Sequence, residues 1–118
     1  MAIPSGTGTE VLKRAGGDAL NGYLGAAVLT VPALHIYTVL TINIIENAGV
    51  AEILSLYMTN ADDSNANTRI VRKLDLPAWG SYVHNDKFVL HPADTFRIFT
   101  EDASNLDYWI SYIDQDWT

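Results

Sequence analysis

Hydrophobic and polar residues alternate along most of the chain from Ala26 onward, where β-branched and aromatic residues are also frequent. A period of two places successive side chains on opposite faces, which predicts β-strands rather than helices. The clearest example is 106–113, where Leu106, Tyr108, Ile110 and Tyr112 alternate with Asp107, Trp109 and Ser111. The same pattern predicts strands over 27–31, 36–46, 51–59, 68–74, 82–83, 88–90 and 95–100.

The alternation also assigns side chains to a buried or an exposed face. It places Phe96 and Ile98 on one face of their strand, and it makes Leu54, Leu56 and Met58 alternate with Ile53, Ser55 and Tyr57. In 68–74 it turns Ile70 and Leu74 inward and exposes Arg69 and Lys73. In 36–46 it groups Ile36, Leu40, Ile42 and Ile44 against Tyr37, Thr41 and Asn43. About 7–8 short strands separated by turns predict an all-β fold, an antiparallel β-sandwich or jelly roll.

The first 25 residues differ from the rest because they contain six of the eight glycines. Residues 7–10 have the spacing of a capping box, which predicts one short helix over Val11–Arg14 that ends at Gly16 and Gly17. We therefore expect an extended N-terminal arm over 1–25 with one short helix, followed by a β-sandwich domain over 26–118. The arm is either a loosely ordered terminus or a segment that becomes ordered on a neighbouring subunit through Ile3, Val11 and Leu12.

Composition narrows the possible partners and chemistry. A chain of 118 residues makes one domain, and its net charge of −7 disfavours nucleic acid or an anionic membrane as a partner. The absence of cysteine excludes disulfides, thiolate nucleophiles and cysteine-based metal sites. The start of the chain lacks the pattern of a secretory signal, and no apolar run approaches the length of a membrane span. We expect a soluble protein.

The sequence contains no strong catalytic motif, so we expect no enzyme activity and no cofactor. Residues 63–67 imitate the first half of a calcium loop, but Thr68 and Leu74 occupy the positions of its glycine and bidentate glutamate. A solvated loop is the better interpretation, and a looser calcium site at Asp62 and Asp63 is the alternative. The three histidines lack the spacing of paired metal ligands, which favours positions in turns or at strand ends.

The aromatic residues allow two interpretations. Trp79 and Trp109 fit a carbohydrate-binding platform, whereas Tyr108 and Tyr112 fit the core. Trp117 follows the last periodic position, so we expect it at an interface. Residues 101–118 contain five acids and no lysine or arginine, which would suit either a basic partner or simple solubility.

Several short segments resemble small virion structural proteins of tailed bacteriophages. They are the opening 2–14, the turn at Val31-Pro32-Ala33, residues 76–80, residues 88–95 and the strand with Ser111-Tyr112-Ile113. The family's usual turn reads Leu-x-Pro-Gly-Asp, and here Ala93 replaces the glycine.

The resemblance implies a capsid decoration, or cement, protein at the capsid surface of the virion, binding the major capsid protein as a homo-oligomer, with a trimer favoured. The expected interface residues are Ile3, Pro4, Val11, Leu12, Lys13, Arg14, Trp79 and Trp117. The alternatives are a neck or tail adaptor or fibre-attachment protein of the virion and, more distantly, a carbohydrate-binding module.

Overall fold

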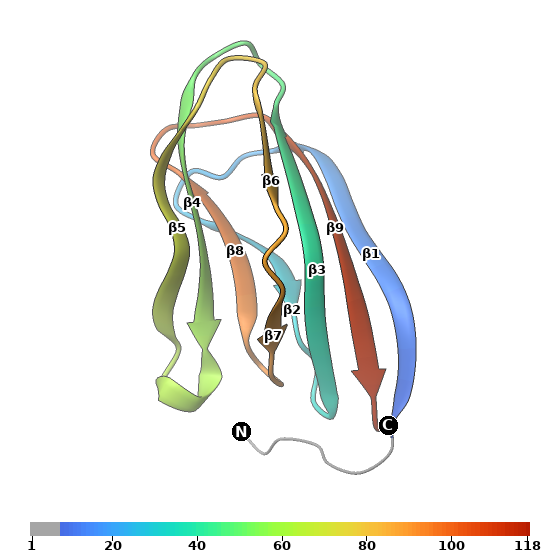
Figure 1. The fold of residues 1–118 in the computed structure, drawn as a ribbon. Coiled ribbons are helices and arrows are strands. Elements are labelled where there is room, and N and C mark those ends of the chain that lie inside the picture. The colour runs from blue at the N-terminus through green and yellow to red at the C-terminus, as the bar shows by residue number, and fades with distance from the viewer. Residues whose placement is uncertain (1–7) are drawn as a thin grey trace.

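The fold consists of two antiparallel β-sheets packed face to face, as Figure 1 shows for the computed structural model, which describes residues 8–118. The strands are β1 (Thr9–Leu20), β2 (Ala26–Thr30), β3 (His35–Glu46), β4 (Glu52–Asn60), β5 (Ala66–Leu76), β6 (Ser81–His84), β7 (Phe88–Leu90), β8 (Thr95–Thr100) and β9 (Leu106–Asp116). A single turn of 3-10 helix, Ala61–Asp63, joins β4 to β5.

The order of the strands defines the topology. One sheet, which we call sheet A, has the order β1-β9-β3-β6, with β7 also paired to β3; the other, sheet B, has the order β2-β8-β4-β5. Because β6 and β7 pair with successive parts of β3, they act as one interrupted strand, and eight strands remain. Four strands in each sheet, with the chain passing repeatedly from one sheet to the other, form a jelly roll. The all-β, two-sheet architecture predicted from the alternation is therefore present.

The core lies between the sheets. It contains the inward-facing residues of both sheets, including Leu54, Leu56, Phe96, Ile98 and Ile110, all fully buried. These positions confirm the faces predicted for β4, β8 and β9. Burial of these apolar side chains is the main force that holds the sheets together.

In β3 the predicted face is wrong for half of the strand. Tyr37 and Val39 are buried, whereas Ile36 and Leu40 are only partly buried. The register between β3 and β9 shifts between Val39 and Thr41, so a β-bulge inserts one residue and reverses the alternation. Beyond the bulge, Ile42 and the rest of the strand return to the predicted face.

The short helix predicted over Val11–Arg14 is also wrong, because these residues belong to β1. Pairing with β9 along almost its whole length supplies the backbone hydrogen bonds that a four-residue helix could not hold alone. The glycines at 16 and 17 do not end a helix. A Cβ at Gly16 would lie 2.5 Å from the Trp109 ring, and one at Gly17 would lie 2.8 Å from the Tyr108 ring. Aromatic side chains of β9 thus cover glycines of an edge strand.

The turn from sheet A to sheet B is held by a buried carboxylate. Glu46, the last residue of β3, is fully buried and accepts hydrogen bonds from the backbone N–H groups of Ala48, Gly49, Val50 and Trp79. Burial alone would raise the pKa of Glu46, but the four N–H donors together outweigh it and lower the pKa below its ordinary value. Glu46 therefore ties together the β3–β4 and β5–β6 turns at one end of the sandwich.

Candidate functional site

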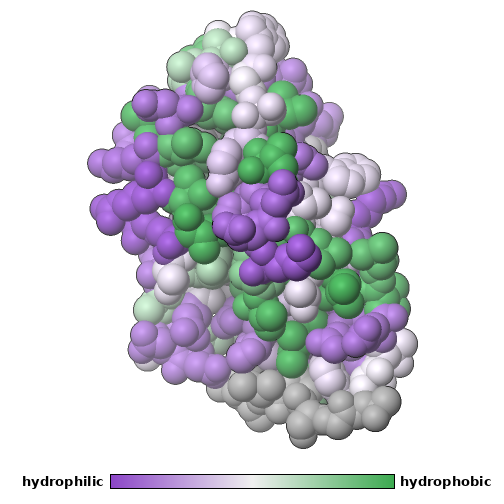
Figure 2. Space-filling view, in the orientation of Figure 1, coloured by the Kyte–Doolittle hydropathy of each residue, from purple (hydrophilic) through white to green (hydrophobic). Residues whose placement is uncertain are grey.

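The outer face of sheet A carries a run of exposed apolar side chains among polar ones, and we call it the apolar face. Its cross-strand partners Gly16, Trp109, Asn43 and Val83 form one row across β1, β9, β3 and β6. Exposed large hydrophobic side chains lie along this face, namely Leu12, Ile45, Val83, Val89 and Trp109. In Figure 2, hydrophobic side chains gather at the lower right of the molecule, on the side where β9 and β1 run. A run of exposed apolar side chains on a small domain is typical of a surface that binds another protein.

Trp109 occupies the middle of this face. Its indole lies over Gly16, and the Arg14 guanidinium lies 4.7 Å from the ring centroid. The ring is nevertheless 46% exposed. Shallow hollows of about 430 and 540 Å³ flank it, the first bounded by Ile45 and the second by Leu12 and Leu40. Trp109 is thus held in place by its own domain while much of its surface stays available.

Strand β1 forms an edge of sheet A within the described residues, so one side of its backbone has no partner strand there. An unpaired edge can add a strand from another chain, and proteins often protect such edges with proline or lysine. The strand contains no proline. Its one lysine, Lys13, bonds to the buried carboxylate of Asp114 at 2.7 Å, and this contact raises the pKa of Lys13.

The predicted interface residues are only partly brought together. Val11, Leu12, Lys13 and Arg14 share β1, and Leu12 is 71% exposed. His35 contacts the other oxygen of Asp114 at 2.7 Å, so the exposed Lys13 is tied to a polar cluster around this buried carboxylate. Leu12 and Arg14 project from the outer face beside β9.

The two tryptophans expected at interfaces lie at opposite ends of the sandwich. Trp79 is 68% exposed in the turn before β6, where its indole covers Gly49. Trp117 follows β9; its ring packs on Gly8, and its backbone N–H bonds to the Leu34 carbonyl. The Trp117 indole Nε1 is buried without a hydrogen-bond partner among the described residues. Ile3 and Pro4 lie outside the described residues.

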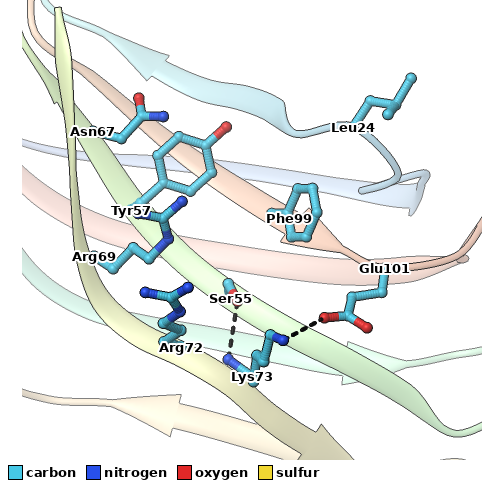
Figure 3. A pocket seen from close by; sticks show the side chains of 9 residues that line it. All are labelled: Leu24, Ser55, Tyr57, Asn67, Arg69, Arg72, Lys73, Phe99 and Glu101. Carbon is cyan, nitrogen blue, oxygen red and sulfur yellow. Dashed lines mark hydrogen bonds and ion pairs between the residues drawn. The ribbon is translucent and has the colours of Figure 1, made fainter.

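The outer face of sheet B carries a basic pocket of about 310 Å³. Figure 3 shows Arg69, Arg72 and Lys73 together on one side of it, with the Tyr57 and Phe99 rings nearby. The Arg69 guanidinium lies 5.9 Å from the centroid of the Tyr57 ring. The residues that line the pocket are Leu24, Ser55, Tyr57, Asn67, Arg69, Arg72, Lys73, Phe99 and Glu101.

Two irregularities in β5 create this pocket. Leu54 pairs with Leu74 and Leu56 with Val71, so Arg72 and Lys73 together face the single residue Ser55. Tyr57 then pairs with Arg69, which leaves Ile70 as a second extra residue. Ile70, Val71 and Leu74 pack against the core, and Arg69, Arg72 and Lys73 are exposed. The bulges thus place three cations on one face, where strict alternation would have turned Arg72 inward.

The backbone at the first of these bulges, opposite Ser55, is unusual. Lys73 has φ of 54°, a left-handed conformation that costs a non-glycine residue about 1–2 kcal/mol. The Lys73 N–H bonds to the Ser55 hydroxyl at 3.0 Å, and its ammonium approaches the Glu101 carboxylate at 3.8 Å. Ser55 therefore fixes the extra residue in place.

Sequence reasoning missed this pocket, although the sequence contains a signal. Residues 69–74 read Arg-Ile-Val-Arg-Lys-Leu, in which two apolar residues and then two basic residues stand side by side. In a strand with one buried face, such doublets are where bulges restore the correct faces. The doublets could have predicted the bulges, and with them the clustering of Arg69, Arg72 and Lys73.

Within residues 8–118, no group of three or more acidic residues or histidines is placed to hold a metal ion. The same residues form no helix long and apolar enough to cross a membrane.

Comparison with known proteins gives a fold and no family. No family model matches the chain, and no curated protein matches its sequence. Among solved structures, a Bacillus endospore-appendage protein, described as forming disulfide-linked pili, matches with a TM-score of 0.59 and 13% identity over 100% of this chain and 97% of the other. A chain of infectious bursal disease virus, strain Gx, matches with a TM-score of 0.57 and 9% identity over 98% of this chain.

A chain from T=1 particles derived from the same virus matches with a TM-score of 0.57 and 8% identity over 92% of this chain. This chain spans 35% and 31% of the two viral chains. At these identities the likeness shows the fold alone. The chain shares a jelly roll with a pilus protein and with part of a viral particle protein.

Proposed function

We propose that this chain is a virion structural protein that decorates a capsid lattice and stabilises the head, acting as a homo-oligomer with a trimer favoured. The observation that carries the proposal is the apolar outer face of sheet A beside the open edge of β1. A small domain with such a face is suited to binding a flat neighbouring surface, and a lattice multiplies weak contacts through many copies.

The fold and the resemblance to phage proteins give further support. Jelly rolls form many viral capsid domains. The segments that resemble small virion proteins of tailed bacteriophages include residues 2–14, which reach into β1. Leu12, Arg14 and Trp109 are the described residues that we assign to the contact, and Trp79 and Trp117 remain proposed contacts at the two ends.

The proposal is tested by locating the chain in a cryo-electron microscopy reconstruction of the particle that carries it. On the order of hundreds of copies on the capsid surface are expected for a decoration protein, whereas about six or twelve at the neck or tail would make the chain an adaptor. Absence from the particle would overturn the virion role.

A variant test addresses the surface itself. Leu12→Asp places a charge on the apolar face and should lower occupancy on particles about 10-fold or more, because the carboxylate must be desolvated at the contact. Val50→Asp is the matched control, since Val50 is also exposed but lies in the β3–β4 turn. Equal loss of occupancy in both variants, or in neither, would contradict the assignment of this face.

A second candidate is a filament subunit, favoured by the match to the pilus protein over nearly the whole of both chains. This chain has no cysteine, so a disulfide-linked assembly is not available to it. Electron microscopy of the purified protein alone separates the candidates. Filaments that form without a capsid would favour the filament subunit, and isolated small oligomers would favour decoration.

A further inference from the structure

The basic pocket on sheet B contains cations that lack counter-charges. Among the described residues, Arg69 and Arg72 form no ion pair, and Lys73 has only the exposed contact with Glu101. Three like charges held on one strand repel each other, so an anion bound between them would gain from relieving that repulsion.

The rest of the molecule has the opposite charge. Three of the seven lysines and arginines line this pocket, which leaves four to balance fourteen acids. A long polyanion approaching the surface would meet repulsion from most of the protein. A short acidic group that enters the pocket would meet mainly the three cations.

The shape of the donors favours a planar oxyanion. Arginine presents paired N–H groups that match a carboxylate at two oxygens, and Arg69 is oriented by its contact with the Tyr57 ring. The neutral polar side chains of Ser55 and Asn67 also line the pocket and can donate further hydrogen bonds. Gly25 leaves room for Tyr57, because a Cβ there would lie 2.5 Å from the Tyr57 hydroxyl.

We propose that this pocket binds carboxylate side chains from an acidic segment of a neighbouring protein subunit, with Arg69 and Arg72 as the principal ligands and Lys73 as a supporting charge. The inference rests on the proposed function, because it takes the ligand from a subunit beside this one in an assembly. It adds a second contact, of different chemistry, to the apolar face of sheet A.

The test uses the full chain before assembly and takes triaspartate peptide as the probe. Binding of the peptide is monitored by NMR at low salt. We expect chemical-shift changes at residues of β4 and β5 that line the pocket, and their loss at high salt. The double variant Arg69→Gln with Arg72→Gln should weaken binding about 10-fold or more. Arg72→Lys should restore part of the affinity lost in Arg72→Gln, because it keeps the charge and loses the paired donors.

Lys87→Gln is the matched control, because Lys87 is exposed and lies between β6 and β7, outside the pocket. It should leave peptide affinity unchanged. The proposal is overturned if the peptide causes no shifts, if Lys87→Gln weakens binding as much as the double variant, or if inorganic phosphate binds the pocket more tightly than the peptide. Peptide binding is measured without particles, so its failure is distinguishable from absence of the chain on particles.

Discussion

The two outer faces of the sandwich differ in chemistry although they belong to the same jelly roll. On sheet A, the register shifts lie on either side of the row through Trp109, between Gly17 and Leu20 and between Val39 and Thr41, and the outer face keeps a run of exposed apolar side chains with Leu12 at its edge. On sheet B, two bulges in β5 gather Arg69, Arg72 and Lys73 around a pocket. Both sheets contain register shifts, but only those in β5 bring together charges that alternation would separate. The face of sheet A suits contact over an area, and the pocket on sheet B suits recognition of a single group.

The largest effect on stability is expected at Glu46, because its carboxylate holds turns that connect the two sheets. Glu46→Gln replaces an acceptor of four backbone N–H groups by an amide whose own NH₂ faces some of those donors. We expect Tm to fall by roughly 10 °C, with loss of order at both faces. Differential scanning calorimetry measures the change. A Tm equal to that of the wild type would show that Glu46 does not hold the sandwich together.

The same carboxylate predicts an acid response with a defined sign. Because the pKa of Glu46 is lowered in the folded protein, its contribution to stability is complete above the ordinary glutamate pKa and is lost as pH falls through the lowered value. Between about pH 5 and pH 3 the Tm of the wild type should fall further than the Tm of Glu46→Gln.

Glu52 provides the matched control at the same end of the sandwich. Burial, and then the charges of Asp102 and Glu46, raise the pKa of Glu52, so its charged form disfavours folding at neutral pH. Glu52→Gln should leave Tm unchanged or raise it. A fall as large as that of Glu46→Gln would mean that any lost carboxylate at this end is destabilising.

The next largest effect would disrupt the apolar face alone. Gly16→Val places a Cβ in the space that the Trp109 ring occupies in the wild type. The ring must therefore move into solvent and lose its contact with Arg14. We expect the free energy of unfolding to fall by about 1–3 kcal/mol in urea, with a red shift of tryptophan fluorescence. Thr9→Val, at an exposed position of the same strand, should change it by less than about 0.5 kcal/mol. An unshifted spectrum for Gly16→Val would show that the ring is not seated on Gly16.

A smaller effect on stability is expected from removing one bulge on the basic face. Deletion of Lys73 lets Ser55 pair with Arg72 and restores regular pairing between Leu54–Leu74 and Leu56–Val71. It removes a residue in the left-handed conformation and also the N–H that Ser55 accepts, so the free energy of unfolding should change by about 1 kcal/mol or less. Triaspartate affinity should fall while the apolar face is unaffected.

The substitution Lys73→Gly separates the bulge from the charge. It keeps the inserted residue and relieves its backbone strain, but it removes the cation. Loss of peptide affinity in both variants attributes the effect to the charge. A deletion that unfolds the protein while Lys73→Gly remains folded would show that the bulge is required for the sheet.

The contrast between the faces also explains how far the sequence could predict this molecule. Alternation correctly placed the inward residues of β4, β8 and β9. In these strands the apolar residues that face the core keep the period of two that the sequence pattern predicts. Alternation failed over residues 36–40, which precede the bulge in β3, because the bulge reverses the face between the two halves of the strand.

The assignment of β1 failed for a different reason. The capping pattern before Val11 is a local signal, whereas the strand is fixed by pairing with β9, about a hundred residues away. The contact between Trp109 and Gly16 marks this pairing, but it joins residues that lie far apart in the sequence and is visible only in the structure. The basic pocket depends likewise on where Arg72 points, which the register of β5 decides.

The smallest effect is expected at a turn that belongs to neither face. Ala93 has φ of 70° and stands where the turn pattern considered in the sequence has glycine. Ala93→Gly relieves the left-handed strain and adds freedom to the unfolded chain, for a net gain of about 0.5 kcal/mol in the free energy of unfolding. Ala33→Gly is the control with the opposite sign, because Ala33 has no positive φ to relieve. This variant should lower the free energy of unfolding by about 0.5–1 kcal/mol. Urea unfolding distinguishes the two signs. If both variants lose stability equally, the turn at Ala93 is not strained, and its departure from the glycine pattern has no energetic consequence.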